Sequence, residues 1–109
     1  MGWRGIEMVR RFDVHLVATQ ADGSAARPCV VLSPDEMNRY LPTVIVAPLT
    51  TRQKDFPSRV HVNFRLKNGQ VALEQIGVVD KSRLLKPLGR LGGNARREVL
   101  VVLAEMFAE

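Results

Sequence analysis

The sequence predicts a mainly β fold of the α+β class: a small, strongly bent sheet or barrel with short helices, closed by a helix at the C-terminus. Three observations predict it. Short apolar runs rich in Val and Ile recur at close spacing, turn-forming residues separate them, and helical periodicity is confined to short stretches and the end of the chain. A length of 109 residues suits one core, so we expect a single domain over residues 1–109.

The first half of the chain contains three predicted strands. From Phe12 to Ala18, alternate positions are apolar, which predicts a half-buried strand with His15 facing outward. Turn-forming residues at 21–24 end it. Continuous apolar runs from Arg27 to Leu32 and from Thr43 to Leu49 predict the other two strands.

The clearest alternation runs over residues 59–66. Its apolar members are expected inward and its polar members outward: Val60, Val62, Phe64 and Leu66 against Arg59, His61, Asn63 and Arg65. Asn68-Gly69 then predicts a hairpin turn, from which Val71 to Val79 returns as a strand.

Two helices interrupt this pattern. Ser33 and Glu36 have the spacing of a capping box, with Pro34 at the first helical position, so a short helix is expected to end near Tyr40. Asn94 is expected to cap the terminal helix. The apolar face of that helix should comprise Val99, Val102, Leu103, Met106 and Phe107. A further helical turn is predicted over 81–85.

Composition restricts the classes of function. Sixteen Lys and Arg against eleven Asp and Glu give a net charge of +5, which favours an anionic partner such as nucleic acid or an acidic peptide. A lone cysteine, Cys29, forms no internal disulfide or cysteine metal cluster and is expected to be a buried small hydrophobe. No apolar stretch approaches the roughly 18 residues of a membrane span, and residues 1–5 lack a secretory pattern. We therefore expect a cytoplasmic protein with no membrane contact.

Few residues offer catalytic chemistry. His15 and His61 could act as acid and base, although two surface histidines are the simpler interpretation. Neither has metal-ligand spacing, so no metal or cofactor is expected. Arg27 stands at the mouth of one strand and Thr50 at the end of the next, where a scaffold presents side chains that can bind phosphate. The alternative is a sheet-edge arginine and a Thr-Thr turn.

The order of motifs resembles the MazF/PemK family of toxin endoribonucleases over roughly residues 11–107. The segments that carry the resemblance are Arg27-Pro28, Val30 to Ser33, Asn38-Arg39, Thr43 to Thr50, Val71 to Ile76, Val79 to Leu84, and Leu88 to Leu91. The resemblance implies an SH3-like, CcdB-like barrel with a C-terminal helix, assembled as a homodimer. It also implies a toxin that cuts single-stranded RNA and arrests translation until a cognate antitoxin covers the site with an acidic, flexible tail.

In this resemblance, the family's catalytic pair corresponds to Arg27 and Thr50. The implied reaction is a metal-free transesterification, in which the ribose 2′-hydroxyl attacks the adjacent phosphorus and leaves 2′,3′-cyclic phosphate and 5′-hydroxyl ends. Arginine supplies positive charge and takes part in proton transfer, and threonine supplies a further donor to the phosphate. The other implied RNA-binding residues are Pro28, Thr51, Arg52, Lys54, Glu74 and Gln75. Arg83 and Lys86 are expected to be solvated or structural.

One departure from the family pattern lies in residues 19–26, which are shorter than the usual connection before the Arg-Pro pair. This connection helps to cover the RNA site, so its contraction bears on the sequence cut and the efficiency of cutting. Two alternatives therefore stay open: a non-enzymatic CcdB-like toxin that binds gyrase, and a degenerate member that only binds RNA or antitoxin.

Overall fold

A computed structural model describes residues 9–109. Among them, the elements in chain order are β1 (Asp13–Ala18), β2 (Ala26–Val31), α2 (Asp35–Tyr40), β3 (Thr43–Thr50), β4 (Arg59–Phe64), β5 (Lys67–Ala72), the 3-10 turn η1 (Leu73–Gln75), β6 (Gly77–Asp80), the 3-10 turn η2 (Lys81–Arg83), β7 (Leu84–Arg90) and α3 (Gly93–Met106).

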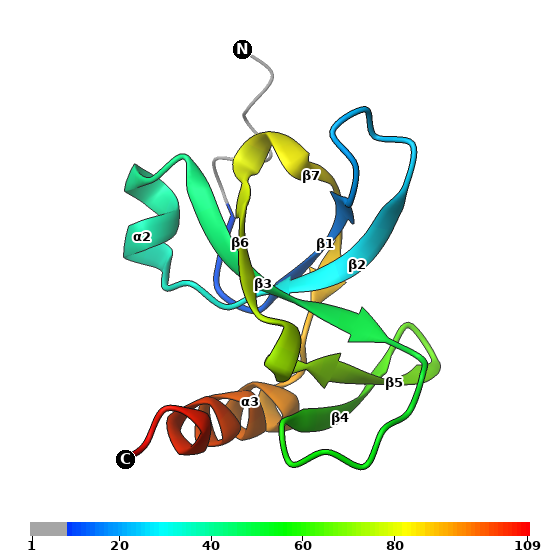
Figure 1. The fold of residues 1–109 in the computed structure, drawn as a ribbon, viewed down its shortest axis with the longest axis vertical. Coiled ribbons are helices and arrows are strands. Elements are labelled where there is room, and N and C mark those ends of the chain that lie inside the picture. The colour runs from blue at the N-terminus through cyan, green and yellow to red at the C-terminus, as the bar shows by residue number, and fades with distance from the viewer. Residues whose placement is uncertain (1–8) are drawn as a thin grey trace.

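The strands form one antiparallel sheet in the order β4-β5-β3-β2-β1-β7, with β6 added beside β3. Figure 1 shows this sheet curled into a half-barrel, with α2 outside the curl and α3 beneath β4 and β5. The predicted mainly β architecture with a closing C-terminal helix is confirmed.

Strand β3 joins the two parts of the sheet. One edge of β3 pairs with β2 from Val46 to Pro48. The other edge pairs with β6 and then, at Leu49 and Thr50, with β5. β3 therefore leaves β2 just where β2 begins, and the two strands form a fork at this point. We call it the β2–β3 fork.

Two apolar clusters bury both faces of β2 and β3. Val30 and Ala47 belong to the cluster that also contains Val99 of α3, whereas Val31 and Val46 belong to a second cluster with β1 and β7 residues. Burial on both sides explains why these strands are continuous apolar runs in the sequence. Cys29 lies in the second cluster as expected, and burial raises the pKa of its thiol to about 11.

The outward position predicted for His15 is wrong, because its side chain is only 2% exposed. The pairing of β1 with β7 shifts register between Val14 and His15 and again between Leu16 and Val17. Such irregularities change the face to which successive side chains point, so both Val14 and His15 are buried. His61 is exposed on β4, as predicted.

The hairpin turn between β4 and β5 lies three residues before its predicted place. Phe64 pairs with Lys67, so Arg65 and Leu66 form the loop, and both have positive φ (54° and 67°). Leu66, expected inward, is 95% exposed at this tip. Asn68-Gly69 lies within β5 instead, because β5 approaches β3 there: a Cβ on Gly69 would stand 2.9 Å from the carbonyl oxygen of Thr50.

The strand predicted over Val71 to Val79 is divided. β5 ends at Ala72, η1 turns the chain, and β6 begins at Gly77. The helical turn predicted over 81–85 is shorter in the structure: η2 covers Lys81–Arg83, and Leu84 and Leu85 already belong to β7.

The capping signals of both helices are used differently from the prediction. α2 begins after Pro34 without a side-chain cap, because the buried Ser33 hydroxyl accepts the Ile45 N–H (3.0 Å) and donates to Asn38 Oδ1 (2.5 Å). For α3, Gly92 rather than Asn94 is the N-cap, and Asn94 accepts a hydrogen bond from Arg97.

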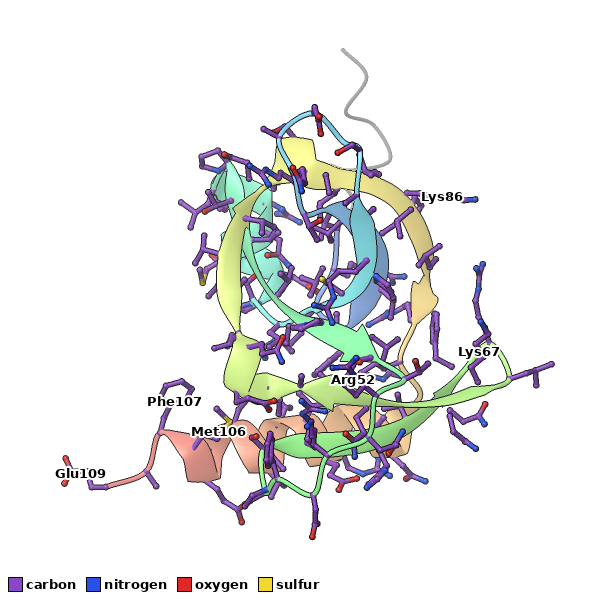
Figure 2. All side chains as sticks on the ribbon, turned by 45° about the vertical axis from the view of Figure 1, so that its right-hand side comes forward. Arg52, Lys67, Lys86, Met106, Phe107 and Glu109 are labelled. Atoms are coloured by element: carbon purple, nitrogen blue, oxygen red, sulfur yellow. The ribbon has the colours of Figure 1, made fainter. Side chains whose placement is uncertain are left out.

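The apolar face of α3 is buried over only part of its predicted length. Val99 and Val102 are buried and Leu103 packs against them. Met106 and Phe107 are exposed because the end of α3 extends beyond the sheet (Figure 2). None of the helices within residues 9–109 has the length and apolar character that a bilayer crossing requires.

Candidate functional site

The β2–β3 fork brings two of the predicted site residues opposite each other. Cys29 pairs with Pro48, and extending this antiparallel register by two residues sets Arg27 across from Thr50. Side chains alternate along strands, so Arg27 shares a face with Cys29, and Thr50 shares a face with Pro48. By this alternation the guanidinium and the hydroxyl belong to one face of the sheet, from two separate strands. The two cavities at the fork have either Arg27 or Thr50 in their walls.

The Arg27 side of the fork is a cavity of about 270 Å³, which we call the Arg27 cavity. Gln75 of η1 and Arg83 of η2 line it together with Arg27. Within residues 9–109, no hydrogen bond or ion pair reaches the Arg27 guanidinium, although this residue is partly buried. Arg83 donates to the Ala18 carbonyl at 3.4 Å, so this second guanidinium has a structural contact.

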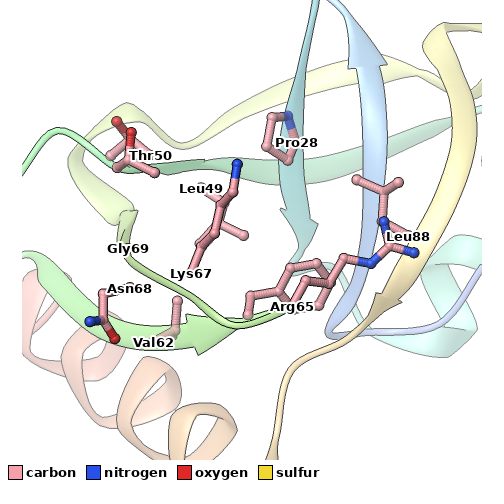
Figure 3. A pocket seen from close by; sticks show the side chains of 11 residues that line it. Pro28, Leu49, Thr50, Val62, Arg65, Lys67, Asn68, Gly69 and Leu88 are labelled. Atoms are coloured by element: carbon pink, nitrogen blue, oxygen red, sulfur yellow. The ribbon is translucent and has the colours of Figure 1, made fainter.

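The other side of the fork, where Pro28 and Leu49 lie, is a larger cavity of about 370 Å³ (Figure 3). We call it the Thr50 cavity because Thr50 borders it, although the Thr50 side chain points to the side of β3 opposite Leu49. Its apolar walls come from β2, β3, β4 and β7: Pro28, Leu49, Val62, Phe64 and Leu88. Thr51 and the two cationic residues of the hairpin, Arg65 and Lys67, also line it. A cavity with an apolar wall and a cationic rim suits a ligand that has both a flat apolar part and a negative charge.

A backbone contact fixes the hydroxyl of Thr50. Thr50 Oγ1 accepts the Arg52 N–H at 3.1 Å. Because a hydroxyl can accept and donate at once, the Thr50 proton remains available for a ligand on the side of β3 opposite Leu49 (Figure 3).

The segment from residue 51 to 57, which we call the 51–57 segment, carries the predicted cations Arg52 and Lys54. All its side chains are exposed, and it has no regular secondary structure. Figure 2 shows Arg52 on the segment that follows the end of β3. This arrangement places two exposed cations immediately after Thr50.

Glu74 and Gln75 are adjacent in η1 but have different environments. Gln75 is exposed at the Arg27 cavity. Both carboxylate oxygens of Glu74 already have protein donors: Oε1 accepts Ser58 Oγ at 2.7 Å, and Oε2 accepts Arg59 Nε at 2.8 Å. The hydrogen bond from Arg59 lowers the pKa of Glu74 to about 2.

Arg59, expected on the outward face, is buried beside this carboxylate. The Arg59 Nη2–Glu74 Oε2 distance is 2.7 Å, and the Arg59 side chain is 5% exposed. Sequence alternation placed Arg59 on the polar face of β4, but η1 and the 51–57 segment cover that face at its start.

Among residues 9–109, no three His, Cys, Asp or Glu side chains are grouped to hold a metal ion. Lys86 projects outward from β7 in Figure 2. It lines neither of the two cavities at the fork.

Comparison with known proteins identifies the family. Residues 10–107 match the family described as the PemK-like, MazF-like toxin of type II toxin–antitoxin systems. The chain belongs to this family. An endoribonuclease MazF of Staphylococcus saprophyticus is 37% identical over 102 residues, covering 84% of this chain and 85% of that protein.

Solved structures of the MazF type share the fold. A MazE–MazF structure from Deinococcus radiodurans has a TM-score of 0.79 and 23% identity, and covers 93% of this chain and 96% of that one. A mycobacterial endoribonuclease in complex with its cognate antitoxin has a TM-score of 0.79 and 24% identity, with 89% and 92% covered. These MazF structures establish the half-barrel with its C-terminal helix as the fold of this chain.

Sequence reasoning missed three parts of the site. Arg65 and Lys67 reach the Thr50 cavity only because the hairpin turns at Arg65-Leu66. Buried Gln70 contacts Lys54, and Arg59 contacts Glu74. The one available signal was Arg59, a charged residue at the start of a predicted strand, and the alternation of apolar and polar residues assigned it to the solvent face.

Proposed function

We propose that this chain is a metal-independent endoribonuclease toxin that cuts single-stranded RNA at selected sequences in the cytoplasm and thereby inhibits translation. The observation that carries the proposal is the β2–β3 fork, where Arg27 of β2 and Thr50 of β3 stand at the ends of two diverging strands, on one face by strand alternation. Membership of the MazF-like family and the 37% identity to an endoribonuclease MazF support the same activity.

The proposed reaction is an internal transesterification. The ribose 2′-oxygen attacks the adjacent phosphorus and loses its proton, while the bond from phosphorus to the 5′-oxygen breaks and that oxygen gains a proton. The products are a 2′,3′-cyclic phosphate and a 5′-hydroxyl, with no water consumed. Negative charge grows on the non-bridging phosphoryl oxygens, where donors held in place lower the barrier most.

Arg27 and Thr50 supply these donors. The Arg27 guanidinium offers paired N–H groups to two phosphoryl oxygens, and the Thr50 hydroxyl, held by the Arg52 N–H, donates another hydrogen bond. Because Arg27 on β2 and Thr50 on β3 hold the phosphate from two directions, the 2′-hydroxyl is oriented in line with the leaving oxygen.

Binding of the flanking RNA extends from this pair. Arg52 and Lys54 hold neighbouring phosphates, Pro28 and Thr51 line the Thr50 cavity beside the cut, and Gln75 faces a base at the Arg27 cavity. Glu74 borders the same base site but offers its carboxylate mainly to Arg59 and Ser58. Unstacked bases of single strands are read in this way through their hydrogen-bonding edges.

We propose that the toxin assembles as a homodimer. The same cationic surface suits an antitoxin with an acidic, flexible tail. A net charge of +5 attracts RNA and an acidic tail alike, so the two partners would compete. The mycobacterial and Deinococcus relatives crystallised with their antitoxins support this partner class.

Incubation with a long mixed-sequence single-stranded RNA in EDTA tests the activity, with cut sites and end groups read afterwards. We expect discrete cuts with 5′-hydroxyl ends that are absent in Arg27→Ala. Arg39→Ala, which removes an exposed arginine of α2, is the matched control and should cut normally.

Two outcomes contradict the proposal. Equal cutting by Arg27→Ala would assign the activity to other residues or to a contaminant. No cutting of a substrate that contains all short sequences would favour a binding-only or gyrase-directed toxin, with the compact 19–26 turn as the first structural suspect.

A further inference from the structure

We propose that Arg59 is a positioning residue for RNA binding: it holds the 51–57 segment in the conformation that presents Arg52 and Lys54. The inference rests on the proposed function, because it concerns how that site holds RNA. Arg59 itself is buried, so it acts through its neighbours rather than by contacting RNA.

The guanidinium of Arg59 joins four residues from three separate parts of the chain. Its Nε and Nη2 contact Glu74 of η1 (2.8 and 2.7 Å), and its Nη1 donates to Gln70 of β5 (2.8 Å). Nη1 also donates to the Arg52 carbonyl at 3.2 Å, and the guanidinium lies 5.3 Å from the centre of the Phe56 ring. Two of these four partners belong to the 51–57 segment, so the same group that is anchored on β5 and η1 fixes the segment.

Gln70 completes the attachment. Its Oε1 accepts the Lys54 N–H at 3.0 Å, and its Nε2 donates to the Lys54 carbonyl at 3.1 Å. Oε1 is also the acceptor for Arg59, which orients the amide so that both contacts with Lys54 form.

The anchors recur at alternate positions of the segment. The backbone of Arg52 and Lys54 and the ring of Phe56 contact Arg59 or Gln70. Just beyond, the hydroxyl and carbonyl of Ser58 contact Glu74 and Leu73 of η1. In a β-strand, such contacts would be backbone hydrogen bonds to a neighbouring strand. Here the buried side chains of Arg59 and Gln70 take the place of those bonds, so the conformation of the segment depends on these two residues.

Positioning has a measurable consequence. Ordered cations bind phosphate with less loss of conformational freedom than cations on a mobile loop. Loss of Arg59 should therefore remove most of what Arg52 and Lys54 contribute, although both cations remain in the chain. Two residues that act through one network should show effects on binding that do not add.

A double-mutant cycle tests this directly. The probe is a cut-site RNA oligonucleotide with one 2′-deoxynucleotide at the scissile position, so that the nucleophile is absent and the RNA stays intact. Its Kd is measured at several KCl concentrations for wild type, Arg59→Met, Arg52→Ala/Lys54→Ala, and the triple variant. We expect a non-additivity of roughly fivefold or more in Kd, and a shallower salt dependence in Arg59→Met despite its intact cations.

Arg90→Met is the matched control. Arg90 is also ion-paired, with Asp13 at 3.2 Å, and it donates to the Arg11 carbonyl, but it lies on β7 away from the 51–57 segment. Its effect on Kd should add to that of removing Arg52 and Lys54. If Arg59→Met does not fold, Glu74→Gln loosens the same guanidinium more gently and should give the same direction of coupling.

The rate of tryptic cleavage after Arg52 and Lys54 measures, without RNA, how firmly the 51–57 segment is held. Arg59→Met should be cut there faster than wild type under conditions in which the rest of the chain stays folded, and Arg90→Met should not. Additive Kd effects, or an unchanged salt dependence, would overturn the inference while leaving the nuclease proposal intact. A wild-type chain that neither binds nor cuts RNA would overturn the nuclease and the role of Arg59 in RNA binding, whereas trypsin would still decide whether Arg59 holds the segment.

Discussion

Two arginines, both at the start of a strand, have opposite environments in this molecule. Arg27 is the second residue of β2 and lines a cavity, and within residues 9–109 its guanidinium has no hydrogen bond or ion pair to protein. Arg59 begins β4, is buried, and contacts Glu74, Gln70 and the 51–57 segment. One guanidinium is therefore available to a ligand, and the other is committed to the fold.

The difference arises from what covers each strand. The β2–β3 fork opens because β3 leaves β2 for β5, so Arg27 has no β3 residue paired with it. At Arg59, η1 and the 51–57 segment close over the strand and provide the Glu74 carboxylate and the Arg52 carbonyl oxygen, and the neighbouring β5 adds the amide oxygen of Gln70. The role of each arginine is therefore set by the segments that lie next to its strand in the folded chain.

The largest expected effect is a contrast in stability between Arg59→Met and Arg27→Met. Loss of the buried guanidinium leaves Glu74, Gln70 and the Arg52 carbonyl without their donor, so we expect Arg59→Met to lower the free energy of unfolding by about 3 kcal/mol. Arg27→Met should stay within about 1 kcal/mol of wild type. Urea denaturation of both variants checks this, and equal losses would contradict the comparison.

Replacing Thr50 tests the chemical role of the fork. Thr50→Val keeps the shape but removes the donor to the phosphate, and we expect a loss in cleavage rate of about thirtyfold to a hundredfold. Thr50→Ser keeps a hydroxyl and should retain most of the activity. Single-turnover cleavage of one RNA measures both, and comparable losses in the two variants would show that the methyl group, not the hydroxyl, is what the site needs.

Gly69 connects the two regions, since it lies behind Thr50 at the place where β5 meets β3. A Cβ at Gly69 would stand 2.9 Å from the Thr50 carbonyl oxygen, so Gly69→Ala should destabilise the fold by about 1–2 kcal/mol. Gly77→Ala is the matched control, because nothing lies within 4 Å of its Cβ position. Thermal unfolding of the pair should separate them, and equal midpoints would mean that β5 shifts away without loss.

The smallest effect expected is on the pH dependence of stability, through His15 beneath β2. Burial lowers the pKa of His15, opposed in part by Asp13, and its Nδ1 has no hydrogen-bond partner within residues 9–109. The unfolded chain thus binds this proton more readily, so the free energy of unfolding should fall as pH drops below about 6.5.

Denaturation midpoints between pH 7.5 and 5 measure that slope. His15→Gln should flatten it, whereas His61→Gln, which replaces an exposed imidazole, should leave it unchanged. A flattened slope in His61→Gln instead would show that His61, not His15, causes the pH dependence.

At lower pH, between about 4.5 and 2, protonation of Glu74 should remove the stability that Arg59 gives to its ionised form.

The sequence predicted most of the strands because a strand's signature is local. The runs that became β2 and β3 are continuous and apolar, and the runs that became β1 and β4 alternate. The fork residues Arg27 and Thr50 were identified from a family resemblance and from their place at strand ends. Both residues are at those ends in the structure, and their chemical roles remain predictions.

The sequence by itself determined a mainly β, strongly bent sheet or barrel, the terminal helix and the excess of positive charge, because periodicity and composition do not depend on distant partners. Only the tertiary structure decided which polar residues are buried. His15 faces the interior through register shifts with β7, and Arg59 is covered by a carboxylate 15 residues away and an amide 11 residues away. Alternation assigns a side chain to one face of a strand, but whether that face meets water depends on segments that only folding brings together.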